Sequence, residues 1–435
     1  MKKIEKFLSP GLLALLRGVV CSFAGAVLLG VINYLIRRIL VQNLSQTDFG
    51  FFYSMFALFT LLTTFSQFGV QQAAPILTAR FFAEKQEKRI DILFSELLFF
   101  SSLAGCVLMC ILFFSSSMLA ERFFKYPEAK SAVAVFSPFV LLYPLWLILQ
   151  SLPHGKRNFS FYNAMNIIQM FCILLGVCFA VRHGVFAVCS AWTAIFAAVL
   201  AAGFAVILRR YRLRLSFRAV FCRKIFQQIW ELCSWMSGSL AGIILLSNLD
   251  TFCLTWFSNL QNVAAYNIAQ PIMQILQTLM VLPLVFLPVA VDLWQKKKYT
   301  EIRRIFLLTN LLLLFGSIPL AAVMHYAGKW VITILFGAQF TGSAPALTIM
   351  SGGILFYVAG QFNLNLLNSI GEQKNGMFLI MGTIALDLLL NVLLIPSRGF
   401  IGAAIALSSA YLLLAASTFS RAAWRLRNAG SPAQL

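Results

Sequence analysis

The amino-acid sequence predicts an all-α polytopic membrane protein. Of its 435 residues, 60% are hydrophobic, and the mean hydropathy is +0.85. A water-soluble chain of this length would lack the polar side chains needed to cover such a core. The hydrophobic residues also fall into a dozen stretches of about 20 residues each, the length that crosses the hydrocarbon core as one helix. These observations favour about twelve transmembrane helices.

In the first half of the chain, each span is an apolar stretch bounded by a short hinge. The spans are expected at residues 12–40, 49–72, 92–118, 131–153, 161–181 and 185–208. The first is longer than the bilayer requires, so it is expected to begin as an interfacial turn that carries Arg17. The fourth contains Pro138 and Pro144, which remove backbone donors and favour a bend.

In the second half, six further apolar stretches follow the basic hinge at 209–224. They are expected at residues 230–256, 263–290, 305–325, 344–368, 377–395 and 400–420. LSQTDFGFFYSMF after the first span is echoed by FSNLQNVAAYNIA after the seventh. The echo indicates two six-helix bundles, 1–215 and 216–435, arranged around a central cavity and suited to alternating access.

The formal charge of +20 would also suit a protein that binds nucleic acid. The basic residues, however, alternate between the two sides of the predicted spans: 26 of the 34 Lys and Arg fall on one side and 8 on the other. Cytoplasmic segments of membrane proteins carry such an excess. The pattern predicts that both termini face the cytoplasm, and it argues against nucleic acid as a partner. The basic hinge at 209–224 is interpreted as an orientation signal that also touches lipid headgroups, with lipid-phosphate docking as an alternative.

The sequence offers little that suits catalysis. The three histidines lie in separate hinges, Asp48 is a lone acid, and no CxxC pair occurs among the nine cysteines. The predicted outer loops are short, which disfavours a membrane-embedded glycan polymerase. No phosphate-binding GxxxxGK[ST] motif is present, so ATP is not expected to drive the protein. We expect no enzyme activity, no catalytic residue, no metal site and no cofactor.

Uncharged polar residues recur at helical spacing within four predicted spans. An amide that faces lipid leaves its donors and acceptors unsatisfied, so these faces should meet each other or water. They either hold helices together or line a wet cavity for a polar substrate, and four such faces favour the cavity. The residues expected to line it are Asn33, Gln67, Gln71, Asn166, Asn267, Gln270, Gln274, Gln277, Gln361, Asn365 and Asn368.

Few ionisable residues fall inside the spans, and each is a functional candidate because burying a charge in lipid is costly. The acids are Glu96, Glu231, Asp250 and Asp387. Asp250 lies deep in its span and is the candidate for any ion coupling.

Several passages, in one order along some 400 residues, resemble a known family. They are Arg38 with LSQTDFG at 44–50, QFGV at 67–70, Asp250 with AAYNIA at 264–269, LFG at 335–337, NSIGEQK at 368–374, and Asn391 with IPSRGFIGAA at 395–404. In this pattern the chain is similar to the polysaccharide-repeat flippases of the Wzx type. These belong to the multidrug, oligosaccharidyl-lipid and polysaccharide exporter superfamily.

The resemblance implies a MATE-like fold and a transport function. The expected substrate is a polyprenyl-diphosphate-linked oligosaccharide, flipped to the outer leaflet of a bacterial inner membrane for surface polysaccharide such as the O-antigen of lipopolysaccharide. Membrane lipids, a polymerase and other assembly proteins are the expected partners. The family is expected to hold the diphosphate with cavity cations, and here Arg17, Arg38 and Arg80 are placed to serve. An ion-coupled multidrug exporter of the same superfamily is the alternative.

Overall fold

The computed structural model describes residues 10–67, 70–156, 158–215, 242–279, 293–294 and 296–428. Within these ranges every regular element is a helix, and each of the twelve predicted spans coincides at least in part with one. Seven described segments are long and apolar enough to cross a membrane, and some of them contain two predicted spans. The all-α polytopic architecture predicted from hydropathy is therefore confirmed.

The chain divides into two compact units. Unit 1 comprises Met1–Leu44 and Phe59–Ser237, and unit 2 comprises Ser45–Leu58 and Gly238–Leu435. The boundary predicted from the sequence, between 215 and 216, falls where the described part of the chain stops. The division also places residues 45–58, the first part of the second predicted span, in unit 2.

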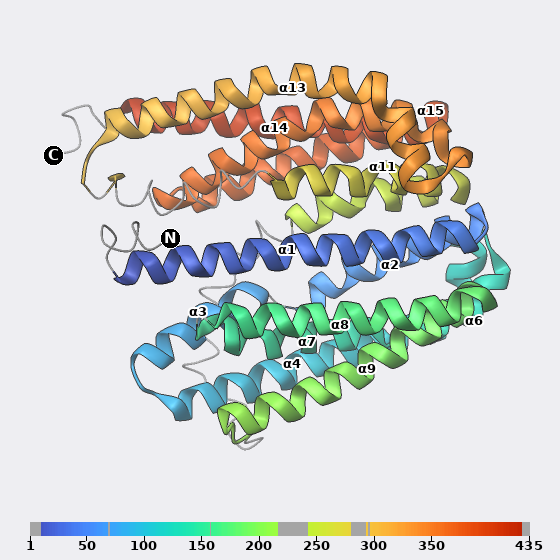
Figure 1. The fold of residues 1–435 in the computed structure, drawn as a ribbon, viewed down its shortest axis with the longest axis horizontal. Coiled ribbons are helices and arrows are strands. Elements are labelled where there is room, and N and C mark those ends of the chain that lie inside the picture. The colour runs from blue at the N-terminus through green and yellow to red at the C-terminus, as the bar shows by residue number, and fades with distance from the viewer. Residues whose placement is uncertain are drawn as a thin grey trace. The chain divides into compact units, whose positions relative to one another are not determined.

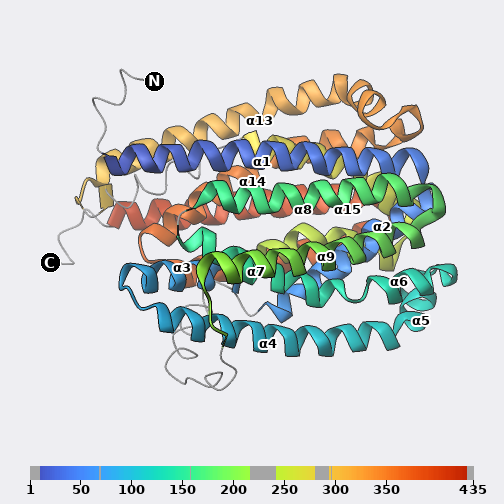
Figure 2. The same ribbon diagram turned by 60° about the horizontal axis from the view of Figure 1, so that its bottom comes forward.

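Unit 1 is built around one buried helix. Its long helices are α1 (Pro10–Asn43), α3 (Val70–Ala83), α4 (Glu87–Phe114), α7 (Phe139–Gly155), α8 (Phe159–Ala180) and α9 (Gly184–Tyr211). Helix α7 packs against α3, α4, α8 and α9, and α1 lies beside α8, as Figures 1 and 2 show. The α6–α7 span buries 61% of its apolar window and the α4 span only 22%, so α4 presents most of its surface outward, as a lipid-facing helix does.

Short elements join these helices on one side of unit 1. They are α5 (Ser116–Met118), η1 (Leu119–Phe123), η2 (Pro127–Ala129), α6 (Lys130–Phe136) and η3 (Val181–His183). The bend predicted in the fourth span occurs where α6 ends and α7 begins, and Pro138 occupies the N-cap of α7. A proline fits this position because its missing N–H leaves no helical bond unmade.

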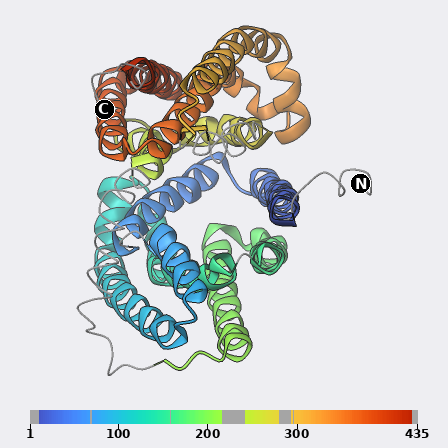
Figure 3. The same cartoon turned by 90° about the vertical axis from the view of Figure 1, so that its left-hand side faces the viewer.

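Unit 2 is centred on α14 (Ala344–Ser369). It packs against α11 (Leu260–Leu279), α13 (Tyr299–Phe336) and α15 (Gln373–Asn428), and the helices are seen close to end-on in Figure 3. The helix Gly242–Phe257 and the short η5 (Ala338–Ser343) complete the described part of the unit. A kink at Gly399, whose φ is 55°, divides α15 into the two spans predicted from the sequence.

Helix α2 (Gln46–Ser66) is shared between the units, since their boundary falls after Leu58. Within unit 2, Gly50 lies so close to α11 that a Cβ there would come within 1.9 Å of the Leu260 carbonyl oxygen. The hydroxyls of Ser54 and Thr255 are 2.5 Å apart nearby. The second predicted span, 49–72, is thus α2 followed by a separate helix, α3, rather than one continuous helix.

Candidate functional site

The polar centre of unit 2 is the carboxylate of Asp250, which is only 1% exposed. The helix Gly242–Phe257 carries it, and two other helices supply its hydrogen-bond donors. Tyr266 of α11 donates its hydroxyl to Oδ2 at 2.6 Å, and Asn391 of α15 donates its Nδ2 to Oδ1 at 2.8 Å. Such bonds to a carboxylate are stronger than those between neutral groups, so the three helices are held together at this point.

A second carboxylate, Asp387, lies one turn before Asn391 on α15. It is fully buried, within electrostatic range of Asp250, and neither of its oxygens makes a hydrogen bond of normal geometry. The Oδ1 of Asn391 is also buried without a donor. Two buried carboxylates within electrostatic range of each other cannot both stay charged unless a cation lies between them; otherwise one of them takes up a proton. The side chains of Asp250, Asp387 and Asn391 therefore offer oxygen atoms that could bind a proton or a cation.

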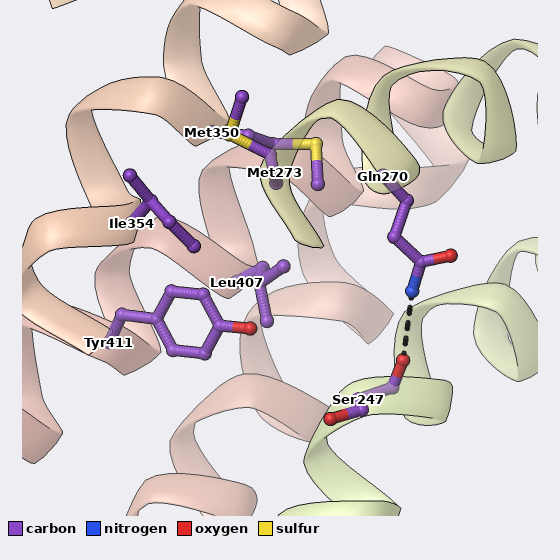
Figure 4. A pocket seen from close by; sticks show the side chains of 7 residues that line it. All are labelled: Ser247, Gln270, Met273, Met350, Ile354, Leu407 and Tyr411. Atoms are coloured by element: carbon purple, nitrogen blue, oxygen red, sulfur yellow. Dashed lines mark hydrogen bonds between the residues drawn. The ribbon is translucent and has the colours of Figure 1, made fainter. Parts of the chain in front are cut away.

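A small pocket opens beside this acid pair. Tyr411 lines the pocket and also interacts with both acids. Tyr411 is within electrostatic range of the two carboxylates, and its ring centroid lies 4.7 Å from that of Tyr357. Figure 4 shows its hydroxyl directed into the pocket, opposite the hydrogen bond from Gln270 Nε2 to the Ser247 carbonyl, 3.1 Å long. The volume is about 30 Å³, room for about two water molecules. The lining residues are Ser247, Gln270, Met273, Met350, Ile354, Leu407 and Tyr411.

The chemistry available here is the binding of a proton or a small cation. Carboxylate and amide oxygens are the ligands that hard cations prefer. Within the described ranges no group of three or more His, Cys, Asp or Glu side chains has a spacing suited to a metal ion. The candidate site thus consists of Asp250, the residue predicted for ion coupling, together with Asp387, Asn391 and Tyr411.

Predicted cavity residues of unit 2 differ in the contacts that they make within that unit. Asn267 is 2% exposed and donates to Val263 O at 3.0 Å and Thr251 Oγ1 at 3.4 Å. On α14, Gln361 has a buried Nε2 with no acceptor, whereas Asn365 and Asn368 are half-buried. The side chains of Gln274 and Gln277 lie outside the described residues. A cavity lined by all of these amides stays a prediction.

Amides of unit 1 also bond within their own unit. Asn166 accepts a hydrogen bond from Gln150 Nε2 at 2.6 Å, which joins α8 to α7. Gln67 is buried and donates to Thr63 Oγ1 at 3.3 Å, whereas Asn33 is exposed and bonds back to its own helix. The Gln71 side chain is among those not described. Only the bond between Gln150 and Asn166 joins two helices, and the other two are each local to one helix.

The three predicted cations lie in different settings within unit 1. Arg80 is exposed and forms an ion pair with Glu84 at 3.0 Å on the outer face of α3. Arg38 is exposed near the end of α1. Arg17 lies on α1, and its side chain is outside the described part of the chain. Their role in binding a diphosphate stays a prediction.

The sequence named Asp387 as a functional candidate but did not place it beside Asp250, and it did not include Asn391 or Tyr411 in the site. A signal for the first two exists, because residues 387 and 391 are one helical turn apart and share a face. Tyr411 gives no such signal, since it lies on the far side of the Gly399 kink and reaches the acid pair only through the packing of α15 on α14.

The fold defines a class: a polytopic membrane protein whose fold is shared with transporters of the multidrug, oligosaccharidyl-lipid and polysaccharide exporter superfamily. The structure is similar to an inward-facing multidrug resistance MATE transporter of that superfamily, with a TM-score of 0.79 and 13% identity over 93% of this chain and 96% of that one. It is also similar to the lipid II flippase MurJ, with a TM-score of 0.73 and 16% identity over 93% and 87%. A third similar structure is a superfamily transporter from Pyrococcus furiosus, with a TM-score of 0.63 and 12% identity over 96% of each chain.

The sequence comparison identifies the family. A model of polysaccharide biosynthesis proteins matches residues 39–345, well over half of the chain, so the protein belongs to that family. An uncharacterized membrane protein of Methanocaldococcus jannaschii is 25% identical over 411 residues, covering 88% of this chain and 79% of the relative. The family resemblance and the MATE-like fold expected from the sequence are confirmed.

Proposed function

We propose that the protein moves a polyprenyl-diphosphate-linked oligosaccharide from the cytoplasmic to the outer leaflet, for surface polysaccharide assembly. The observation that carries the proposal is that a chain of the polysaccharide biosynthesis family has the fold of superfamily transporters, a lipid II flippase among them. Membership of the polysaccharide biosynthesis family supports a glycan substrate, and the likeness in fold to transporters supports movement across the membrane.

The barrier explains why such a protein is needed. A glycan with many hydroxyls and a charged diphosphate cannot enter about 30 Å of hydrocarbon, whereas a polyprenyl tail dissolves there. A transporter that alternates between two open states solves this by offering the sugars a polar path while the tail stays in lipid. Exposed amides and arginines such as Asn33 and Arg38 are suited to hydroxyls and phosphate oxygens.

The acid pair of unit 2 supports coupling of this movement to a proton or a monovalent cation. A bound proton or cation would reduce the repulsion between Asp387 and Asp250, which Asn391 already contacts. Release of that proton or cation would leave two carboxylates that repel each other. Because Asp387 and Asn391 lie on α15 and Asp250 lies on the helix Gly242–Phe257, the two states would favour different packing of these helices.

The fold equally matches multidrug transporters, so the substrate has to be tested directly. Protein in liposomes is given a fluorescent polyprenyl-diphosphate oligosaccharide in one leaflet, and its accessibility to a membrane-impermeant quencher is followed over time. We expect transfer well above that of protein-free liposomes, slowed by Arg17→Ala and Asp250→Asn. Immobility of several such glycans, combined with uptake of a cationic dye under a proton gradient, would instead establish a multidrug exporter.

A further inference from the structure

Two cations are held over aromatic rings at one end of unit 1. The Lys156 ammonium lies 4.3 Å from the centroid of the Phe82 ring and 4.8 Å from that of Tyr211. The Arg210 guanidinium lies 4.4 Å from the centroid of the Phe161 ring and also interacts with Tyr211. We call these five side chains the basic-aromatic cluster. It is assembled where α3, α7 and α9 end and α8 begins.

The rings fix the cations without neutralising them. A cation over a ring face keeps its outward donors free, and its side chain has already lost much of its rotamer freedom. No carboxylate of the described chain forms an ion pair with Lys156 or Arg210, and both are exposed. Exposed arginines at 209, 212 and 214 add to the positive potential. The nearby acid Asp91 accepts the backbone N–H of Arg214 at 3.1 Å.

Three other exposed or partly exposed arginines are arranged differently, because each is paired with a carboxylate. In unit 2, Arg421 donates to Glu372 at 2.6 Å, and Arg425 approaches the same carboxylate at 3.3 Å. In unit 1, Arg80 is paired with Glu84. These cations have a counter-charge within the protein. Neither cation of the basic-aromatic cluster forms an ion pair with a described side chain, so both are available to an external anion.

The position of the cluster indicates the source of that anion. Lys156 directly follows α7, and Arg210 is in the last turn of α9; both helices belong to segments long and apolar enough to span a membrane. The cations therefore lie at the depth of the lipid headgroups, on the side that the distribution of Lys and Arg predicts to be cytoplasmic. We propose that the basic-aromatic cluster is a binding site for the phosphate of an anionic phospholipid, held between Lys156 and Arg210.

Native mass spectrometry of the purified full-length chain, titrated with phosphatidylglycerol or phosphatidylcholine, tests this site. The variant is Lys156→Gln with Arg210→Gln. The matched control is Arg303→Gln with Arg304→Gln, which removes the same charge from exposed positions near the start of α13. We expect one tightly retained phosphatidylglycerol on the native protein and the control, and roughly 10- to 30-fold weaker retention on the variant. Binding of phosphatidylcholine should be weak and equal in all three.

Two further measurements keep the proposal falsifiable if the variant folds poorly. Lys156→Arg with Arg210→Lys keeps both charges and should retain phosphatidylglycerol. Phe82→Leu with Phe161→Leu removes the rings that hold Lys156 and Arg210 but keeps both charges. It should weaken the retention of phosphatidylglycerol by a few-fold. Equal retention by the native protein and the glutamine variant, or an equal loss in the control, would overturn the proposal. So would retention of a polyprenyl diphosphate in preference to phosphatidylglycerol, which would make the cluster a docking site for the transport substrate.

Discussion

At the scale of single residues, the two acids of unit 2 differ in the support that each receives. Asp250 accepts hydrogen bonds from Tyr266 and Asn391, whereas the oxygens of Asp387 have no hydrogen bond of normal geometry. Both side chains are buried. Removing the charge should therefore change the free energy of unfolding in opposite directions at the two positions. Substitution of Asp250 breaks hydrogen bonds, whereas substitution of Asp387 removes an uncompensated buried charge.

Asp250→Asn should lower the free energy of unfolding by about 1–3 kcal/mol, since its new amide cannot accept both existing bonds. Asp387→Asn should leave stability unchanged or raised in sodium-free buffer. It should also abolish the rise in melting temperature that a bound cation gives the native protein. Thermal unfolding in detergent, with sodium chloride compared against choline chloride and at several pH values, measures these effects. Glu301→Gln, an exposed acid of unit 2, is the control.

Glu372 provides a pH-dependent test outside the membrane spans. Burial alone would raise the pKa of this carboxyl, but hydrogen bonds from Arg421 and Asn375 and the charges of Arg421 and Arg425 lower the pKa overall. A lowered pKa in the folded state means that Glu372 stabilises the fold above its unfolded-state pKa. This contribution is lost as the pH falls through the folded-state pKa.

Glu372→Gln should accordingly be less stable than the native protein at pH 7, and the difference should shrink steadily as the buffer is made more acidic than pH 5. Unfolding followed at a series of pH values gives the comparison. A difference that stays constant down to acid pH would show that the carboxylate charge does not tie the α14–α15 connection to the end of α15.

At the scale of elements, the contact of α2 with α11 depends on the absence of a side chain at Gly50. An added Cβ would lie 1.9 Å from the Leu260 carbonyl oxygen, far inside van der Waals contact. Gly50→Ala should therefore destabilise the protein by at least about 1–3 kcal/mol, the usual cost of overpacking. Gly30→Ala on α1, where a Cβ would meet nothing within 4 Å, should be neutral or slightly stabilising. Melting temperatures in detergent that fall equally for both variants would contradict this packing.

Most elements could be predicted from the sequence, because a bilayer imposes one requirement, a sufficiently long apolar helix, which composition alone reveals. The span at 49–72 was the exception. It divides into α2 and α3, and α3 runs on to Ala83. The close approach at Gly50 that joins α2 to α11 depends on side-chain packing between distant segments, and hydropathy carries no information about that.

At the scale of the whole molecule, the family and the fold agree with the sequence, while the site is only partly predictable. Asp250 could be identified because a charge deep in an apolar span is costly whatever surrounds it. Its partnership with Asp387 and Tyr411 could not, because these residues lie more than 130 positions away and meet it through the kinked helix α15. The cavity predicted from the amide stripes stays a prediction, because several of these amides, such as Asn166 and Asn267, bond to side chains of their own unit.

The central claim is that transport of a lipid-linked oligosaccharide is coupled to a cation through this acid pair. Its most direct test is oligosaccharide transfer between leaflets in liposomes that carry either a sodium or a proton gradient. Native protein is compared with Asp387→Asn and with the control Glu301→Gln. We predict that one of the gradients accelerates transfer by the native protein and the control, and that Asp387→Asn loses the acceleration. Transfer that responds to neither gradient, or a response that survives in Asp387→Asn, would contradict the account.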